Sequence, residues 1–304
     1  MIDPKLQTLR VLRTHGTVTA AALALHLTPS TVSHQLKQLA RETGIRLLEP
    51  NGRRVRLTPA AEVLLEHADV MYTHWERAKV DLAALDAGQK GHLRICGLSS
   101  TVSAFIAPMA KRLRKDNPGV RLHLAAVESV EAFQMLESGD ADIAVISPVD
   151  TTPQPSDRRF EQQFLVEDVE DLLVSADHPL AGRESVALTE AADEDWVSMF
   201  SCLDQEQLFL SSTAAAGFAP HLAHRADTYY SASALVCNGF GVSLYSRLVP
   251  VPVEHLVVRV PIHGKPIPTR RLFTAVRRGS AEQPAITRGL TAIREEVARR
   301  AAMA

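Results

Sequence analysis

The chain has 304 residues, of which 46% are hydrophobic and 22% charged, and its formal net charge is −2. This composition is typical of a soluble globular protein that is long enough for two or three domains. The sequence has no apolar run long enough to cross a bilayer and no signal-peptide layout at its start, so we expect a cytoplasmic protein that does not bind membranes. Its three cysteines are far apart and form no CxxC pair, which argues against a zinc knuckle or a disulfide framework.

Charge is distributed unevenly along the chain. Residues 1–60 carry nine lysines and arginines against three acids, a net charge of +6, whereas the remainder carries 24 basic and 32 acidic residues, a net of −8. A basic N-terminal segment followed by an acidic remainder indicates that only the N-terminal segment binds a polyanion. Charge does not decide the matter by itself, because many solvated surfaces are locally basic.

Three short helices are predicted near the N-terminus. Leucines at helical spacing predict a helix over residues 4–14, and Thr17 can cap a second helix that ends near residue 27. Thr28 and Pro29 then start a third helix, because a hydroxyl N-cap followed by proline suits the first helical turn. The buried stripe of this third helix consists of Val32, Leu36 and Leu39.

The other face of the third helix is polar. Hydroxyls at a helix N-terminus can bond phosphate oxygens and base edges, and Lys37 adds a charge for a phosphate. A merely solvated helix face would have a similar composition. The Asn51–Gly52 turn favours the first interpretation, because the arginines around it suit a hairpin wing along a DNA backbone. We therefore predict a winged helix-turn-helix with DNA contacts from Thr28, Pro29, Ser30, Thr31, Ser33, His34, Lys37, Arg53, Arg54 and Arg56.

A long helix is predicted from Pro59 onward, since no further glycine or proline occurs before Gly88. Its apolar residues recur in steps of three and four over more than three heptads, which is typical of a coiled-coil seam. An amphipathic helix packed on its own domain would show the same pattern. The seam consists of Ala61, Leu64, Ala68, Met71, Trp75, Ala78, Leu82 and Leu85, of which Leu64, Met71, Trp75 and Leu82 are the predicted dimer contacts.

Beyond a hinge at Gly88–Gly91, strands and helices alternate in the order of an α/β unit with parallel strands. The first strands are predicted at residues 92–96, 120–127 and 142–146. Further strands at 172–175 and 196–199 belong to a second lobe, whereas the strand at 272–276 and the helix at 284–300 return to the first.

The N-terminal region resembles the LysR-type transcriptional regulators. The matching motifs are Thr17–Ala22, Leu25–Ser33 and Leu57–Ala61, and the body adds Asp177–Ala181 and Asn238–Leu244. Several positions depart from the family pattern and bear on operator preference rather than on the fold. Pro29 stands where glutamine is usual, Leu48 and Pro50 where phenylalanine and arginine are common, and Ala61 replaces a glycine.

The resemblance covers essentially the whole chain and implies its architecture. It implies an N-terminal all-α winged helix-turn-helix with a long linker helix, and a C-terminal α/β two-lobed regulatory domain similar to periplasmic solute-binding proteins. The expected boundaries are 1–58, 59–87 and 88–304, with lobe I at about 92–162 and 269–304 and lobe II at about 163–268. The implied partners are double-stranded DNA with an inverted repeat, a small-molecule effector, and a second copy of the chain in a dimer or tetramer. RNA polymerase is a candidate partner, and no cofactor or metal is indicated.

An effector is expected where ligands of open α/β sheets bind, beyond the carboxyl ends of the strands. Two polar turns follow predicted strands and a third, at residues 227–231, precedes a predicted helix, and Ser147 closes a strand that we expect to cross between the lobes. Hydroxyls and backbone N–H groups at helix starts suit a carboxylate, although plain N-caps would use the same residues. The resemblance places effector contacts at Ser99–Thr101. The predicted contacts are Ser99, Ser100, Thr101, Ser147, Ser201, Cys202, Thr228 and Tyr229.

These features favour a transcriptional regulator whose DNA binding responds to a small molecule held between two lobes. The alternative is a cytoplasmic solute-binding protein with a helical dimerisation module. An enzyme is disfavoured, because the sequence has no phosphate-binding glycine loop, no GxSxG elbow and no clustered metal ligands. Cys202 has no partner at a paired spacing, so we expect a packed thiol there rather than a redox sensor.

Overall fold

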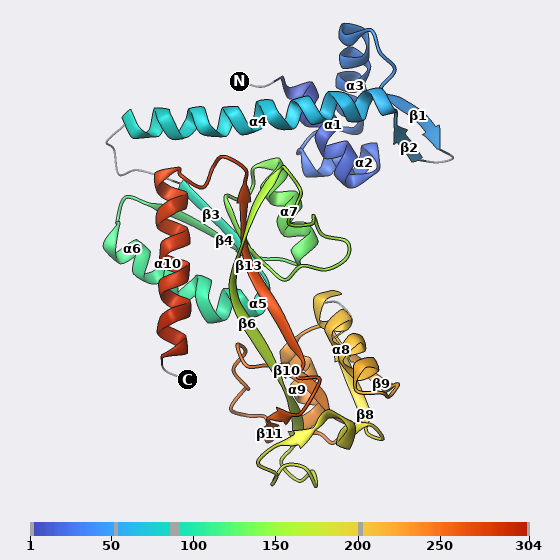
Figure 1. The fold of residues 1–304 in the computed structure, drawn as a ribbon, viewed down its shortest axis with the longest axis vertical. Coiled ribbons are helices and arrows are strands. Elements are labelled where there is room, and N and C mark those ends of the chain that lie inside the picture. The colour runs from blue at the N-terminus through green and yellow to red at the C-terminus, as the bar shows by residue number, and fades with distance from the viewer. Residues whose placement is uncertain (1–2, 52–53, 86–91, 200–202, 303–304) are drawn as a thin grey trace.

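The structure is a computed structural model that describes residues 3–51, 54–85, 92–199 and 203–302. It consists of a small helical head, a long linker helix and a body of two lobes; the head and the two lobes follow one another along its longest axis, and the linker helix runs across this axis at the level of the head (Figure 1). None of the helices in the described part of the chain is long and apolar enough to cross a membrane.

The head is formed by three helices and a two-stranded wing: α1 (Pro4–His15), α2 (Val18–Ala24), α3 (Pro29–Thr43), β1 (Leu48–Asn51) and β2 (Arg54–Leu57). Each helix starts at a side-chain cap. Asp3 accepts a hydrogen bond from the backbone N–H of Lys5 at 2.9 Å, and Thr17 and Thr28 accept from residues 20 and 31, each at 3.1 Å. α1 and α3 end at glycines with left-handed backbone, as expected for residues without a Cβ.

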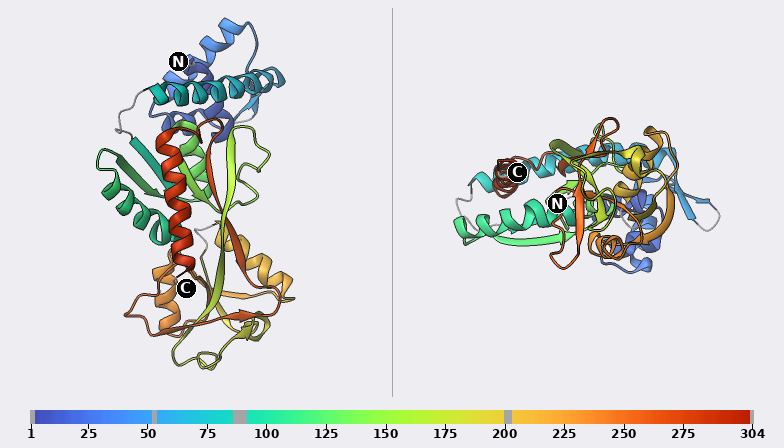
Figure 2. Two further views of the ribbon diagram at one scale, coloured as in Figure 1. Left: turned by 60° about the vertical axis from the view of Figure 1, so that its left-hand side comes forward. Right: turned by 90° about the horizontal axis from the view of Figure 1, so that it is seen from below.

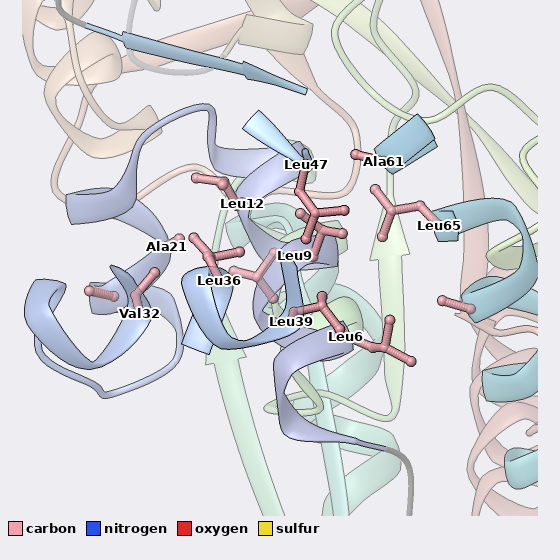
Figure 3. Close-up of a cluster of buried hydrophobic side chains, with 13 residues drawn as sticks. Leu6, Leu9, Leu12, Ala21, Val32, Leu36, Leu39, Leu47, Ala61 and Leu65 are labelled. Atoms are coloured by element: carbon pink, nitrogen blue, oxygen red, sulfur yellow. The ribbon is translucent and has the colours of Figure 1, made fainter. Parts of the chain in front are cut away.

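One apolar cluster holds the head together (Figure 3). Leucines from α1 and α3 meet at its centre with Ala21 of α2, Leu47 before the wing, and the first turns of the linker helix. Leu9 is completely buried in this cluster. The buried stripe predicted for the third helix is confirmed, since Val32, Leu36 and Leu39 all face the cluster.

The linker helix α4 (Pro59–Leu85) begins at the capping hydroxyl of Thr58, which accepts from the N–H of Ala61 at 3.1 Å. Its first turns belong to the head, because Ala61, Leu65 and Ala68 are buried in the cluster described above. Further along, the helix leaves the head and lies across the top of the body (Figure 1). The helix thus serves two purposes, as part of the head core and as a rod that extends from it.

The first lobe contains the parallel strands β3 (His92–Gly97), β4 (Arg121–Ala126) and β5 (Ile143–Ile146), in the order β4-β3-β5. Apolar residues from α6 (Ala107–Asp116) and α10 (Pro284–Ala301) pack on one face of this sheet and those of α7 (Ser129–Ser138) on the other. α6 continues a helical segment that starts with α5 (Ser99–Thr101) and the π-helical stretch η1 (Val102–Ile106).

Two long antiparallel strands join the lobes: β6 (Phe160–Ser175) and β13 (Thr269–Arg277). β13 lies beside β5 of the first lobe, while the far end of β6 pairs with β10 (Ser243–Ser246) and β11 (Val257–Val260) of the second. Figure 1 shows both strands running from one lobe into the other. The remaining elements are β7 (Val186–Ala187), η2 (Leu188–Ala191), β8 (Asp195–Met199), α8 (Leu203–Ala215), β9 (His221–Ala226), α9 (Tyr229–Cys237) and β12 (Ile262–His263).

The head rests on the first lobe of its own chain (Figure 2). The side chain of Gln7 in α1 donates to the carbonyl oxygen of Glu137 in α7 at 2.9 Å, and the hydroxyl of Thr14 donates to the Glu137 carboxylate. Arg159 holds that carboxylate from the other side at 2.9 Å. α4 is tied to the body through Glu76, which accepts from Arg277 at 3.2 Å and from Gln283 at 2.8 Å.

The predicted fold class is confirmed, with corrections to several elements. The second helix ends at residue 24 rather than near 27. The strand predicted at 172–175 is the end of a longer strand that begins at Phe160. The first half of β6 is largely polar, and it forms a strand because it pairs with β13. Ser147 does not close a crossing strand, since it follows β5, and the strands that cross are β6 and β13, which are antiparallel to each other. The predicted hinge at Gly88–Gly91 lies outside the described residues.

Replacing Leu9 with alanine should selectively loosen the head. Loss of this buried side chain is expected to cost about 2–5 kcal/mol, measured as faster hydrogen exchange of the α1 and α3 amides by mass spectrometry. Leu23→Ala is the matched control, because Leu23 lies in the same domain with 79% of its surface exposed. Equal effects of the two substitutions would contradict the packing described for α1.

Candidate functional site

The exposed face of α3 gathers the polar residues predicted for its start. Thr28, Pro29, Ser30, His34 and Lys37 are exposed, and Thr31 and Ser33 are partly exposed. The hydroxyl of Thr28 lies 2.8 Å from the hydroxyls of Ser30 and Thr31, so three hydroxyls are clustered at the first turn. This face therefore presents donors and acceptors outward while its opposite side is fixed in the head core.

The wing follows the predicted hairpin. β1 and β2 pair from Leu48 opposite Leu57 to Asn51 opposite Arg54. The guanidinium of Arg56 is exposed and lies 3.6 Å from the carboxylate of Glu49. Arg53 lies outside the described residues.

The predicted seam of the linker helix is divided between two environments. Leu64 is half-buried against the head core, whereas Met71, Trp75 and Leu82 are 44%, 37% and 59% exposed. The helical repeat of 100° per residue places these three on one side of α4. Glu76, which holds Arg277 of the body, faces another side. α4 therefore presents a row of apolar side chains away from its own body.

A cleft of about 530 Å³ lies between the lobes. Four of the predicted contacts line it, with Ser99 and Ser100 from the first lobe and Thr228 and Tyr229 from the second. This volume is in the range that small-molecule sites occupy. The cleft also opens where α5 and α9 begin, at the place expected for ligands of an α/β sheet.

Two other predicted contacts, Thr101 and Ser147, do not line this cleft. The hydroxyl of Thr101 is buried and donates to the carbonyl oxygen of Leu98 at 2.8 Å, which holds the first turn of the helical segment. Ser147 is buried, and its N–H donates to the hydroxyl of Ser129 at 3.0 Å. Both are structural contacts. Ser201 and Cys202 lie outside the described residues.

The charged side chains that line the cleft are acidic. Glu128, Glu131 and Asp227 line it, and no lysine, arginine or histidine does so among the residues that the structure describes. Hydroxyls at helix starts predicted an anion site, but acidic side chains that the sequence patterns did not single out surround them.

Beneath the cleft lies a buried cluster around Arg270 of β13. Its guanidinium donates to Asp168 of β6 and to Asp204 of α8, at 2.8 and 2.6 Å. It also donates to the hydroxyl of Ser100 at 2.7 Å. Glu170 of β6 is completely buried nearby and accepts from Gln205 at 3.0 Å. The cluster thus joins elements of both lobes through one arginine.

Burial dominates the protonation of this cluster. It raises the pKa of Glu170 to about 8, with Arg270 opposing the rise and Asp168 adding to it. Burial likewise raises the pKa of Tyr229 well above its ordinary value. Burial disfavours the charge of Arg270, yet Tyr229 and the carboxylates around it hold the pKa of the guanidinium well above its usual range.

Sequence patterns did not identify this cluster, although one signal was available. Asp168 and Glu170 are two residues apart directly before the apolar run Leu172–Val174, and the period of a strand places them on one face. Acids on the buried face of a strand need a partner. The partner, Arg270, is about 100 residues away in the chain, so only the fold reveals the pairing.

A larger cavity of about 870 Å³ lies where α4 meets the body. Two ion pairs form part of its wall, since Arg13 holds Asp69 at 3.0 Å and Arg159 holds Asp157 at 2.8 Å. We interpret this space as the joint between head and body, not as a ligand site.

Comparison with known proteins agrees with this two-part organisation. The family described as "Bacterial regulatory helix-turn-helix protein, lysR family" matches residues 4–62, and the family described as "LysR substrate binding domain" matches residues 86–298. The chain belongs to the LysR family. It is a DNA-binding transcriptional regulator with an effector-binding domain, and the solute-binding alternative is set aside because the helix-turn-helix match covers the whole head.

Relatives and solved structures extend the likeness over nearly the full length. The regulator MetR of Salmonella typhimurium is 31% identical over 93% of this chain and 87% of its own, and AlsR of Bacillus subtilis is 28% identical over 73% of each. These relatives are transcriptional regulators, a class of protein that is not enzymatic. A full-length OxyR of Pseudomonas aeruginosa covers 98% of this chain and 94% of its own, with a TM-score of 0.65 at 19% identity. HinK of the same organism covers 97% and 98%, with a TM-score of 0.62 at 20% identity; both likenesses concern the fold.

The raised pKa of Glu170 should make stability depend on pH. Its carboxyl has an ordinary pKa of 4.5 when unfolded and a pKa of about 8 when folded, so its contribution is fully present below pH 4.5 and is lost as pH rises through 8. Glu170→Gln keeps a neutral side chain at every pH and an acceptor for Gln205. The melting temperature of this variant should therefore gain on the unmodified protein between pH 5 and pH 8.5.

Glu167→Gln serves as the control, because Glu167 is exposed on the same strand. Its melting temperature should follow that of the unmodified protein across the series. A Glu170→Gln difference that stayed constant with pH would show that Glu170 is ionised throughout.

Proposed function

We propose that α3 enters the major groove of DNA and that its exposed polar face reads the operator. The observation that carries this proposal is the arrangement of α3 itself. Its apolar stripe is fixed in the head core, and its hydroxyls, His34 and Lys37 are directed outward from the first three turns. The N-terminal part of a recognition helix is the part that contacts base edges. Arg53, Arg54 and Arg56 of the wing are proposed to lie along the phosphate backbone.

The linker helix is proposed to pair two copies of the chain. The support for this is the row of Met71, Trp75 and Leu82, which are large apolar side chains exposed on a side of α4 that faces away from the body. Pairing along this row would bury them and would relate two heads by a two-fold axis. Such a pair requires an operator with two inverted half-sites. Dimers that associate further, contact with RNA polymerase and a cytoplasmic location are parts of the same proposal.

The inter-lobe cleft is proposed as the effector site, with Ser99, Ser100, Thr228 and Tyr229 among the contacts. Binding there shifts the balance between two arrangements only if the effector prefers one of them. The cleft is connected to the head through the first lobe, because α7 supplies both Glu131 at the cleft and Glu137 at the contact with α1. A change in the position of α7 would therefore be transmitted to the head.

Lys37→Ala should weaken DNA binding without changing sequence preference. Loss of one phosphate contact is expected to reduce affinity for all sequences alike and to lower the slope of log affinity against log salt by about 1. The measurement is fluorescence anisotropy across a salt series, with the DNA upstream of the protein's own coding sequence and a random duplex of equal length.

Lys115→Ala is the matched control, since Lys115 is an exposed lysine in the body at the end of α6. It should leave both the affinity and the salt slope unchanged. An unaltered slope in Lys37→Ala would remove Lys37 from the proposed interface, and absence of DNA binding even at low salt would overturn the assignment of α3.

The double substitution Met71→Glu and Leu82→Glu should separate the dimer. Burying carboxylates without partners is costly, so the dissociation constant of the dimer should rise by about 100-fold or more, as measured by analytical ultracentrifugation. Arg77→Glu changes the net charge by the same amount on the other side of α4 and should leave the dimer intact. A dimer that survives the double substitution would show that pairing uses another surface.

A further inference from the structure

We propose that the effector of this regulator is a cation, of the class of small amines and guanidines. This inference rests on the proposed function of the inter-lobe cleft and specifies the chemistry of its ligand. Three independent features carry it: the charge of the cleft wall, the state of the Arg270 cluster beneath it, and the exposed apolar surface at its rim.

The cleft wall is acidic on both sides. Glu128 and Glu131 approach from the first lobe and Asp227 from the second. Asp227 is exposed and accepts a hydrogen bond from the hydroxyl of Ser231 at 3.0 Å, which fixes its carboxylate at the start of α9. A cation placed between the lobes is attracted by both walls and would draw them together. An anion would be repelled by both, because like charges in one site disfavour each other.

The Arg270 cluster does not offset this charge. Arg270 is the obvious candidate to bind an anion, but its three donor nitrogens already serve Asp168, Asp204 and Ser100. Glu170 adds a third carboxyl group to the same cluster. The carboxylates of Asp168 and Asp204 outnumber the single guanidinium, and the neutral carboxyl of Glu170 adds no positive charge, so the cluster does not offset the acidic wall above it.

One carboxylate oxygen of this cluster still lacks a donor. Asp204 Oδ1 is buried and has no hydrogen-bond partner within the described part of the chain. A buried acceptor without a partner costs about 1–3 kcal/mol, so a bound group that brings N–H donors would relieve it. Ammonium and guanidinium groups carry several donors and no acceptor, whereas a carboxylate carries none. Ser100 and Tyr229 belong both to the cluster and to the cleft, which makes the two regions continuous.

The rim supplies surface for the rest of such a ligand. Val127, Tyr230 and Val249 line the cleft, and Tyr230 as a residue is 57% exposed. An aromatic face attracts a cation as well as an alkyl chain. The site therefore fits a short carbon chain that ends in a positive group.

The test compares short four-carbon probes of opposite charge on the full-length protein. 1,4-Diaminobutane and agmatine are measured against succinate by isothermal titration calorimetry at low salt. The two cations are expected to bind at least ten times more tightly than succinate. The double substitution Glu131→Gln and Asp227→Asn should reduce their affinity by about tenfold or more, which corresponds to about 1.4 kcal/mol. The control, Asp116→Asn with Glu282→Gln, removes two exposed carboxylates far from the cleft and should leave binding unchanged.

Binding of DNA by the same preparations is measured in parallel, so that failure of the ligand class is separate from failure of the regulator. Tighter binding of succinate, or no binding of either cation, would overturn the cationic effector while DNA binding remained intact. Equal loss of affinity in both double variants would also overturn it, because the effect would then be one of net charge. Loss of DNA binding in the unmodified protein would instead contradict the proposed function.

Discussion

The buried guanidinium of Arg270 is the interaction on which the arrangement of the two lobes depends. It lies on a strand that crosses between them, and its partners come from the other crossing strand, from α8 of the second lobe and from α5 of the first. A charge that is fully buried is tolerated only when it is paired and hydrogen-bonded. Any movement that separated the lobes would break one of these bonds within a nearly dry interior. The cluster therefore restricts the lobes to arrangements in which Arg270 stays paired.

Because of this restriction, a small ligand in the cleft can change the relative position of the lobes. A ligand shifts a conformational balance only by the difference between its affinities for the two states. In the cleft that difference arises from carboxylates carried by separate lobes, whose distances to a bound cation change together when the lobes move. The buried cluster has one carboxylate oxygen, Asp204 Oδ1, that has no donor among the described residues, and it shares Ser100 and Tyr229 with the cleft, so the pairing of Arg270 responds to the same event.

Sequence patterns predicted the local elements better than the site. Caps at Thr17 and Thr28 and the apolar stripe of α3 depend on residues within one or two turns, and the structure has each of them. β6 was recognised only at its end, because its first half is polar and becomes a strand through pairing with β13. Ser99, Ser100, Thr228 and Tyr229 were found because helix starts attract ligands, yet the acids that set the charge of the cleft carry no local pattern.

The linker helix shows why the spacing of apolar residues alone does not tell which of them form a dimer interface. One apolar repeat runs along its whole length. In the first three turns the side chains of this repeat pack in the head core, and beyond them they are exposed to solvent. The first part is fixed by Leu65 and Ala68, so the direction in which the rod leaves the head is determined by packing within one chain. Glu76 then holds the rod to Arg277, and Arg277 also bonds Asp142 in the first lobe at 3.0 Å. The same helix carries the exposed row of Met71, Trp75 and Leu82. The orientation of any surface that covers this row is therefore set by the contacts of α4 with the head at one end and with the first lobe at the other.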